Sequence, residues 1–364
     1  MSLAGRVHTE PDVAWPSLAS WPLSRPHVVG TLPTSARNIN LLIEDSSGSR
    51  YVLRGCRRNP HRERIIFQLE FQDHLRRCGI PVPQVVASQT GDRCVESSPG
   101  SLWVMFHFVA GHHYLYGSGA QLLQAARCLS GIHAAGPGFT ATPVQDDTIP
   151  DLLRWWTHGE EEMAGLRAMF AGAGLEPELD FLDSWRTALT RDLPLPVIDE
   201  LPRTWLHADF HPSNVVFADD EVRAVLDFDV VHRGFRLADI AYAMFCFCRQ
   251  SRSSTVIGAE ASAVFLQAFD LTDLERRALP YFTVAVQART AARYRVRERE
   301  GTDPRQALRT HVRRMRALST RVGVLTHVVP PQPGALAEAC GVGLEPEGAA
   351  STSAQAGRFS LGCW

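Results

Sequence analysis

The chain has 364 residues and a formal net charge of −2 at pH 7, with 45% apolar and 21% charged residues. This length and composition predict a globular protein of about two domains or lobes. No apolar run approaches the ~20 residues of a membrane helix, no secretory signal is visible, and the charge balance argues against nucleic-acid binding. We expect a cytoplasmic protein with reduced thiols, because none of its eight cysteines lies in a C-x-x-C pair.

All 37 basic residues are arginines, and the chain contains no lysine. A lysine Schiff base is therefore impossible, which excludes pyridoxal enzymes and Schiff-base aldolases. A standard P-loop is excluded as well, because its motif requires a lysine. A lysine-type cation that binds phosphate in this protein must be an arginine.

The N-terminal part of the chain, residues 1–107, shows short strand patterns around one helical pattern. Its first 30 residues are rich in Pro and Trp, lack periodicity and are expected to form an irregular lead-in. Apolar segments flanking the turn cluster D-S-S-G-S predict a hairpin. The expected elements are strands at 38–44, 50–54, 84–88 and 102–109 and a helix over 60–78. Together they predict a small antiparallel sheet with one helix.

The remainder of the chain is mostly helical, with one interruption. The expected helices cover 121–133, 151–170 and 177–190, and helices resume from Leu237 to about Leu325. Between 204 and 240 the helical period gives way to strand, loop, strand, turn and strand. We therefore predict an α+β fold with a helical second lobe over 108–328, and a disordered tail over 329–364, which is rich in Pro, Gly, Ala and Ser.

One block of the sequence concentrates groups that can do chemistry. It reads W-L-H-A-D-F-H-P-S-N-V-V-F from Trp205, and L-D-F-D follows from Leu226. Two carboxylates and an amide, those of Asp209, Asn214 and Asp227, lie at strand ends around a tight hairpin. These hard oxygen groups suit Mg²⁺ rather than Zn²⁺. Phosphoryl transfer needs the same set, with one carboxylate for the attacking hydroxyl and an amide and a carboxylate for the metal.

These residues have simpler interpretations as well. Asp and Asn are common in ordinary turns, so each residue taken singly carries little information. A zinc-dependent hydrolase with His207, Asp209 and His211 as ligands is a second alternative. Bound Zn²⁺ would favour the hydrolase, whereas Mg²⁺ dependence would favour phosphoryl transfer.

The block H-A-D-F-H-P-S-N, then L-D-F-D, then G-F-R-L-A-D-I-A, resembles the aminoglycoside phosphotransferase and choline kinase superfamily. Members of this superfamily carry H-G-D-x-H-x-x-N, I/L-D-F/W and G-x-x-x-x-D-L-A and share the bilobal protein-kinase-like fold. The resemblance implies ATP or GTP as phosphoryl donor, Asp209 as catalytic base, and Asn214 and Asp227 as Mg²⁺ ligands. The other matched side chains are expected to support the catalytic loop: His207, His211 and Asp239. Ala208 replaces the family's glycine, which matters only if this residue needs a positive φ.

The same resemblance assigns nucleotide contacts to the N-terminal lobe. In R-Y-V-L-R, Arg54 lies where the family has its phosphate-binding cation, and an arginine fork suits phosphate. Its carboxylate partner is expected on the following helix, where Gln68 occupies the usual glutamate position and Glu63 or Glu70 is the alternative. Further nucleotide contacts are expected from the covering loop that ends at Asn38 and from the hinge over Met105 to His107.

The distribution of charged residues along the chain suggests which kind of acceptor substrate the protein binds. Residues 137–200 hold 13 acidic residues against four arginines, a net charge of −9. Because the family builds its acceptor pocket from this region and the C-terminal helices, this charge favours a small, hydroxylated and cationic acceptor. Solvated helix faces are the alternative interpretation of the acidic residues. Residues 289–321 carry 11 arginines, which suggests an exposed helix rather than nucleic-acid binding.

We predict a small-molecule kinase, of antibiotic or secondary-metabolite type because of the arginine-only composition. A homoserine- or choline-type metabolite kinase is the alternative, and a catalytically weak binding protein of pseudokinase type is another. A protein kinase fits less well, because D-F-D replaces D-F-G. The sequence gives no preference between a monomeric and a dimeric protein.

Overall fold

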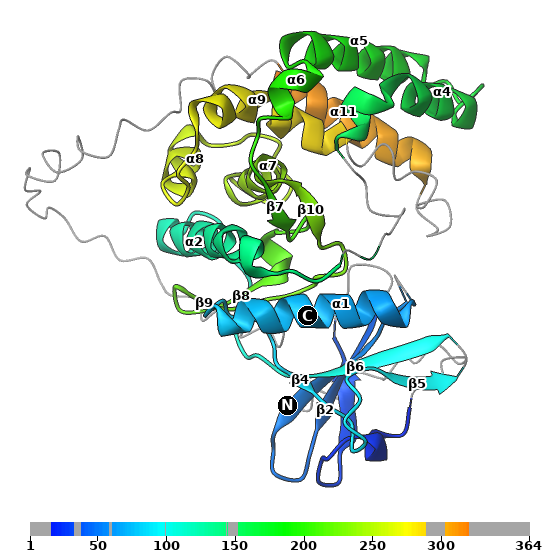
Figure 1. The fold of residues 1–364 in the computed structure, drawn as a ribbon, viewed down its shortest axis with the longest axis vertical. Coiled ribbons are helices and arrows are strands. Elements are labelled where there is room, and N and C mark those ends of the chain that lie inside the picture. Colours follow the sequence, from blue (N-terminus) through cyan, green and yellow to red (C-terminus); the bar gives the residue numbers. More distant parts are fainter. Residues whose placement is uncertain are drawn as a thin grey trace, which may run out of the picture.

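The structure is a computed structural model that describes residues 16–32, 38–57, 60–98, 100–142, 144, 152–288 and 303–319. An N-terminal lobe built from a sheet and one helix lies against a C-terminal lobe of helices, as Figure 1 shows. The bilobal α+β architecture expected from the sequence is therefore confirmed. The tail over 329–364 lies outside the described residues.

The N-terminal lobe is an antiparallel sheet in the order β1-β2-β3-β6-β4, with β5 paired to β6. Its elements are β1 (His27–Thr31), β2 (Ile39–Glu44), β3 (Arg50–Gly55), α1 (Arg62–Arg77), β4 (Val85–Val86), β5 (Val95–Ser98) and β6 (Ser101–His107). The expected hairpin is present, with Leu42 opposite Val52. The expectation of an irregular lead-in is wrong for residues 27–31, which pair with β2 as an edge strand.

Side chains alternate between the two faces of this sheet, as the strand period requires. One face packs under the lead-in residue Trp21, which is 1% exposed, together with Leu53 and Met105. The opposite face packs on α1, where Ile65 contacts Val104 and Phe106 in one apolar cluster. Arg54 follows Leu53, so its side chain belongs to the face that α1 covers.

The C-terminal lobe contains a long apolar core surrounded by helices. Its elements are α2 (Gly119–Ala135), α3 (Arg154–Thr157), α4 (Gly159–Met169), α5 (Glu176–Asp192), α6 (Leu195–Ile198), β7 (Arg203–Leu206), β8 (Val215–Ala218), β9 (Glu221–Val225), β10 (His232–Phe235), α7 (Arg236–Phe247), α8 (Ala259–Leu266), α9 (Asp273–Ala288) and α11 (Pro304–Ser319). Two short ribbons lie among them, β7 with β10 and β8 with β9. Single-turn 3₁₀ helices occupy Leu18–Ser20, Gly136–Gly138 and Pro212–Asn214.

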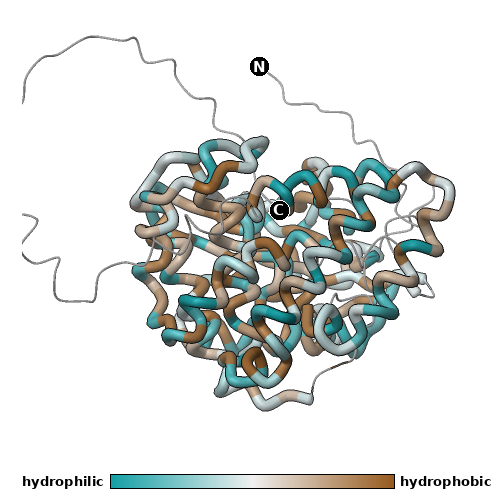
Figure 2. Tube along the Cα trace, turned by 90° about the horizontal axis from the view of Figure 1, so that it is seen from above, coloured by the Kyte–Doolittle hydropathy of each residue, from teal (hydrophilic) through white to brown (hydrophobic). Residues whose placement is uncertain are grey.

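The single helix expected over 151–170 is instead two, α3 and α4, separated at His158. A Cβ on Gly159 would lie 2.7 Å from the Arg186 side chain of α5, so α4 begins at a close approach between two helices. The tube in Figure 2 alternates between hydrophilic and hydrophobic colours along its helices. This pattern is typical of amphipathic helices with one face toward a core. Among the described residues, no helix combines the length and apolarity needed to cross a membrane.

The two lobes meet where the chain leaves β6. His112 forms an antiparallel bridge with Phe217 of β8, through main-chain bonds of 2.8 Å in both directions. A Cβ on Gly111 would lie 2.3 Å from the Phe217 carbonyl oxygen and 2.5 Å from Val216 Cγ1. Only glycine allows the connecting segment to lie this close to β8, and this contact fixes the hinge of the cleft.

Candidate active site

The loop between β7 and β8 carries the residues singled out from the sequence. Ala208 within it has φ of 63°, in the left-handed region that favours glycine. This residue therefore does need the positive φ that explains the family's glycine, and the alanine is strained. Its methyl group is buried against Leu206 and Val230, so packing partly offsets the strain.

A buried carboxylate on α7 holds the start of this loop. Asp239 is 1% exposed and accepts the main-chain N–H groups of His207 and Ala208, both at 2.8 Å. It also lies 3.2 Å from Nε2 of His133 on α2. Burial works to raise the pKa of Asp239, but the hydrogen bond from His133 and the nearby imidazoles outweigh it and hold the pKa below its usual value.

His207 is fully buried and connects the loop by hydrogen bonds to the segment after β9. Its Nδ1 accepts the Asp209 N–H at 3.2 Å, so Nε2 carries the hydrogen and donates to the Leu226 carbonyl at 2.9 Å. Burial lowers the pKa of His207 despite the neighbouring carboxylates. Because protein groups engage both ring nitrogens, His207 is a poor candidate for a zinc ligand.

Asp209 lies at the mouth of the loop, where its side chain is 21% exposed. Oδ2 is 3.8 Å from Nε2 of His211, and Oδ1 accepts a hydrogen bond from the Tyr242 hydroxyl at 3.3 Å. Asn214 donates its Nδ2 to the Asp209 carbonyl at 3.0 Å, which leaves Oδ1 as the acceptor of that amide. The sequence interpretation missed Tyr242, although it lies one helical turn after Asp239 on the same helix.

The N-terminal lobe supplies a cation to the opposite side of the cleft. Arg54 is 9% exposed, and its Nη2 lies 2.9 Å from both Asp227 Oδ1 and Asp229 Oδ2. Asn38 donates to the same Asp229 oxygen at 2.7 Å. Burial alone would lower the pKa of Arg54, but the two carboxylates more than reverse this and raise it. The side chains of Arg54, Gln68, Asp227 and Asp229 line one cavity between the lobes.

The expectation that a glutamate of α1 pairs with Arg54 is wrong. Glu63 and Glu70 are both exposed, because they lie on the side of α1 that faces solvent. Gln68 is the residue that faces the cavity, and its amide donates to the Asp229 carbonyl at 3.2 Å. Thus Asp227 and Asp229, rather than a residue of α1, neutralise Arg54.

A second link between α1 and the same segment was not predicted. Arg64, 2% exposed and one turn before Gln68, donates Nη2 to the carbonyls of Val231 at 2.5 Å and Asp229 at 3.2 Å. Its only sequence signal is the helical spacing of four residues from Gln68.

The expected hinge also needs correction. Met105 pairs with Leu53 on one side and Val86 on the other, and its side chain is fully buried on the face away from α1. His107 is exposed, and its N–H donates to the Gln84 carbonyl at 2.9 Å. Sheet pairing therefore engages the main chain of Met105 and the N–H of His107, and the segment that connects the lobes begins directly after His107, where β6 ends.

Apolar residues of both lobes pack on the segment that follows His107. Phe108 packs on Leu32, Leu42 and Val52 of the N-terminal lobe. The next residue, Val109, packs on a cluster of the C-terminal lobe formed by Val216, Ala224 and Leu226. The connecting segment is thus anchored to an apolar cluster of each lobe.

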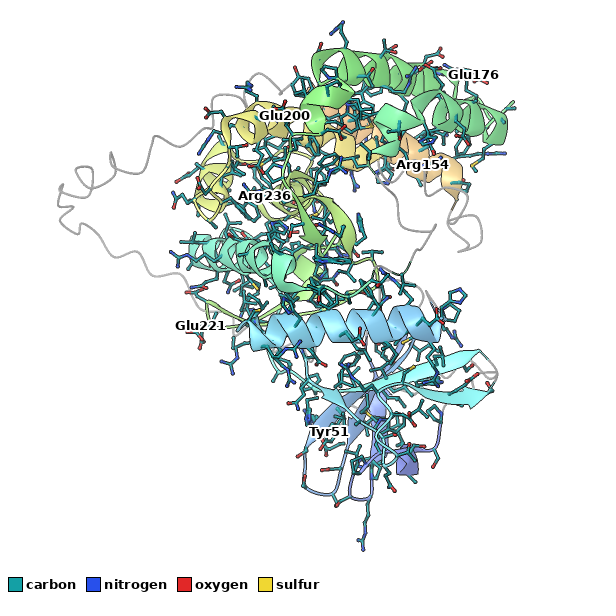
Figure 3. The ribbon with its side chains drawn as sticks, in the orientation of Figure 1. Tyr51, Arg154, Glu176, Glu200, Glu221 and Arg236 are labelled. Atoms are coloured by element: carbon teal, nitrogen blue, oxygen red, sulfur yellow. The ribbon has the colours of Figure 1, made fainter. Side chains whose placement is uncertain are left out.

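The acidic helices lie away from this cleft. Figure 3 shows Arg154 and Glu176 among the side chains at the end of the C-terminal lobe farthest from the sheet. Several of these acidic groups form ion pairs with arginines of the same layer: Arg154 with Glu162, Arg167 with Asp180, Arg186 with Glu160 and Asp183, and Arg203 with Asp199. These ion pairs compensate part of the acidic charge of the layer.

A cleft between a small sheet lobe and a helical lobe, with a buried cation on one side and carboxylates on the other, defines a phosphotransferase of the protein-kinase-like fold. A family model described as the phosphotransferase enzyme family matches residues 31–281, so the chain belongs to this family. It is a phosphotransferase with an alcohol as acceptor.

Similar proteins of known name include metabolite and antibiotic kinases. A homoserine kinase of Zymomonas mobilis subsp. mobilis is 26% identical over 248 residues, which cover 66% of this chain and 72% of the relative. A microcompartment-associated aminopropanol kinase has a TM-score of 0.63 at 17% identity, covering 86% of this chain and 97% of its own. Amicoumacin kinase, solved with AMP-PNP, has a TM-score of 0.59 at 16% identity, with 83% and 91% covered.

Proposed function

We propose that this protein transfers the γ-phosphoryl group of ATP or GTP to a hydroxyl of a small molecule with the help of Mg²⁺. One observation carries the proposal. Arg54 and Asp227 lie 173 residues apart in the sequence and meet at 2.9 Å in the cavity between the lobes. Leu226, the residue before Asp227, donates its N–H to the Asn214 carbonyl at 2.8 Å, so this cavity adjoins the loop that carries Asp209. A cation for phosphate, an oxygen ligand set and a partly exposed carboxylate are thus close together, as phosphoryl transfer requires.

Asp209 acts on the acceptor in this proposal. Its carboxylate accepts a hydrogen bond from the acceptor hydroxyl and takes the proton as the new bond between that oxygen and the γ-phosphorus forms. The bond from the γ-phosphorus to its bridging oxygen breaks, and the nucleoside diphosphate leaves with that electron pair. The Tyr242 hydroxyl at 3.3 Å and the Asn214 bond to the Asp209 carbonyl hold the carboxylate in position. Alignment and charge stabilisation provide most of the rate enhancement.

On the donor side, the same cleft would hold nucleotide and metal. Asn214 Oδ1 and the carboxylate of Asp227 are hard oxygen ligands of the kind that Mg²⁺ prefers. A bound Mg²⁺ would supply positive charge to the phosphate oxygens of the donor. In the structure Arg54 forms ion pairs with Asp227 and Asp229, so a phosphate that binds this guanidinium exchanges one anionic partner for another.

Two classes of acceptor are compatible with this site. The arginine-only composition led us to an antibiotic or secondary-metabolite kinase, and the structural similarity to amicoumacin kinase is consistent with that class. The second class, a metabolite kinase of homoserine or choline type, is favoured by the homoserine kinases among the relatives, at 26% identity over 248 residues for that of Zymomonas mobilis.

A thermal-shift titration with ATP and GTP, each with Mg²⁺ and with EDTA, tests the nucleotide site. A nucleotide at 100 times its Kd adds about 2.7 kcal/mol. With an unfolding entropy of about 2.1 cal/mol/K per residue, a chain of 364 residues then gains about 3–4 °C in Tm. No shift with either nucleotide would contradict the proposal.

Two variants test the assigned roles. Asp209→Asn should abolish turnover and leave the nucleotide shift unchanged, since this carboxylate acts on the acceptor. Asp227→Ala should lose turnover and the Mg²⁺ dependence of the shift. Wild-type turnover in Asp209→Asn would remove Asp209 from the role of base.

A further inference from the structure

Two arginines lie near one aromatic ring of α7, the helix whose Tyr242 bonds the carboxylate proposed as the catalytic base. Tyr242, which donates to Asp209, begins a face of α7 that continues through Phe245. The guanidinium of Arg249 lies over the Phe245 ring at 4.6 Å, and that of Arg314 on α11 lies near the same ring at 5.9 Å. Residues three apart on a helix are separated by about 5–6 Å at their Cβ atoms. Tyr242 also acts electrostatically on Arg314, so this cation lies in the neighbourhood of the tyrosine whose hydroxyl donates to Asp209.

The charge of Arg314 has no carboxylate partner among the residues that the structure describes. This side chain is half-buried, and its charged neighbours Arg249 and Arg313 are both positive. Burial and then the Arg249 charge lower the pKa of Arg314. A half-buried cation without a counter-ion is unfavourable, because it loses hydration and gains nothing in return.

Arg249 is only partly satisfied. Its Nη1 donates to the carbonyls of Arg252 at 2.9 Å and Ser254 at 3.2 Å. Its Nε is buried and has no hydrogen-bond acceptor in the described part of the chain. A buried N–H without an acceptor is unusual enough to indicate a missing group.

Other part-buried arginines of this lobe are compensated. Arg186 lies 2.6 Å from Glu160, and Arg236 binds Glu275 through two bonds of 2.6 Å. The lobe therefore supplies carboxylates to these partly desolvated arginines, and among the described residues Arg314 is an exception.

We propose that Arg314, assisted by Arg249, binds a carboxylate of the acceptor whose hydroxyl lies at Asp209. This proposal rests on the proposed phosphotransferase function and narrows its substrate class to small hydroxylated carboxylic acids. A carboxylate offers two oxygens to a guanidinium fork, and its single negative charge would neutralise the half-buried Arg314. A short-chain hydroxy acid or hydroxy amino acid carries both the hydroxyl and the carboxylate that such a site would bind.

This assignment reverses the sign of the acceptor charge that the composition of residues 137–200 favoured. Several acidic groups of α4 and α5 are engaged in ion pairs, such as Asp180 with Arg167 at 3.0 Å. Arg314 and Arg249 are positive instead, and these two cations would repel the amino groups of an aminoglycoside and attract an acid.

The experiment compares acceptors that differ only in the carboxylate. Phosphorylation of L-homoserine and of 3-aminopropan-1-ol, which is the same chain without its carboxylate, is measured with the full-length protein, with kanamycin as a cationic reference. We expect at least a tenfold higher kcat/KM for L-homoserine. Phosphorylation of 3-aminopropan-1-ol or kanamycin with equal or higher efficiency would overturn the proposal and leave the phosphotransferase function intact.

Variants then test the residue. Arg314→Gln should raise KM for the carboxylated acceptor by about 10- to 100-fold and leave KM for the nucleotide unchanged, since a hydrogen-bonded charge is lost at one site. Arg314→Lys should recover part of this loss. The matched control is Arg313→Gln, whose side chain is exposed on the same helix and should change KM by less than twofold.

The remaining outcomes are equally decisive. An unchanged acceptor KM in Arg314→Gln refutes the role of this residue. If the wild-type protein gives the nucleotide-dependent thermal shift but phosphorylates no carboxylated acceptor, the inference fails and the nucleotide site stands. If no nucleotide shift occurs, the proposed function itself fails.

Discussion

Replacement of Asp239 by alanine should destabilise the protein through the main chain of the catalytic loop. The carboxylate accepts the N–H groups of His207 and Ala208, both at 2.8 Å, in a place where Asp239 is 1% exposed. Without it, two buried N–H groups lose their acceptor, at about 1–3 kcal/mol each. We therefore expect a loss of roughly 4 kcal/mol for Asp239→Ala. Asp239→Asn retains one acceptor oxygen and should lose about half of this.

Thermal unfolding of the full chain measures the effect. An unfolding entropy of about 2.1 cal/mol/K per residue over 364 residues converts 4 kcal/mol into a Tm lower by about 5 °C. The exposed Asp199, which pairs with Arg203 at 2.7 Å on the surface, provides the control, and Asp199→Ala should change Tm by less than 1 °C. A Tm for Asp239→Ala within 1 °C of the wild type would refute the reasoning.

The pH dependence of this variant gives a second check. The pKa of Asp239 is held below its ordinary value of 3.8, so its stabilising effect is fully present above that pH. It is lost as the pH falls through the lowered pKa, where the native carboxylate takes up a proton. The difference between wild type and Asp239→Ala should therefore be constant from pH 5 to 7 and shrink below about pH 4.

Two further predictions concern the hinge and the buried imidazole. Gly111→Ala should lower stability by about 1–3 kcal/mol and weaken nucleotide binding in a titration, because the new methyl group meets the main chain of β8 at 2.3 Å. Gly119→Ala, which meets no atom within 4 Å, is the control, and equal effects would contradict the steric argument. Burial lowers the pKa of His207 below its ordinary value of 6.5, so the unfolded chain binds the proton more strongly than the folded one. The free energy of unfolding should therefore fall as the pH drops below 6.5, by up to about 1.4 kcal/mol per pH unit. Urea denaturation at several pH values should show a shallower dependence for His207→Gln, and identical slopes would rule out His207 as the source.

Much of the fold could be predicted from local patterns in the sequence. The hairpin of β2 and β3 was predictable because its turn cluster and its two apolar segments are adjacent, and the structure pairs them with Leu42 opposite Val52. Strand β1 was missed because its burial only alternates between exposed and half-buried, so its sequence lacks an apolar face. The break between α3 and α4 depends on the contact of Gly159 with Arg186 of another helix, which no local pattern can show.

The residues of the candidate site also fall into those that a local motif predicts and those that depend on tertiary packing. Asp209 and Asn214 are five residues apart on one loop, so a motif was enough to place them together. Which residue of α1 faces the cleft depends on how the helix is rotated against the sheet. For this reason the expectation for Glu70 failed, and the role of Asp229 as partner of Arg54 was not foreseen. Arg314 belongs to α11, and only tertiary packing brings it near Phe245 of α7.

The hydrogen bonds from α1 to the segment after β9 have a consequence for how the molecule opens. Arg64 and Gln68 donate hydrogen bonds of 2.5 to 3.2 Å to the carbonyls of Asp229 and Val231, so the helix of one lobe is bonded to the main chain of the other. Amide hydrogens in α1 and in this segment should then exchange with solvent in one joint opening event, with the same protection. The two lobes would unfold as a single cooperative unit rather than as two independently melting domains.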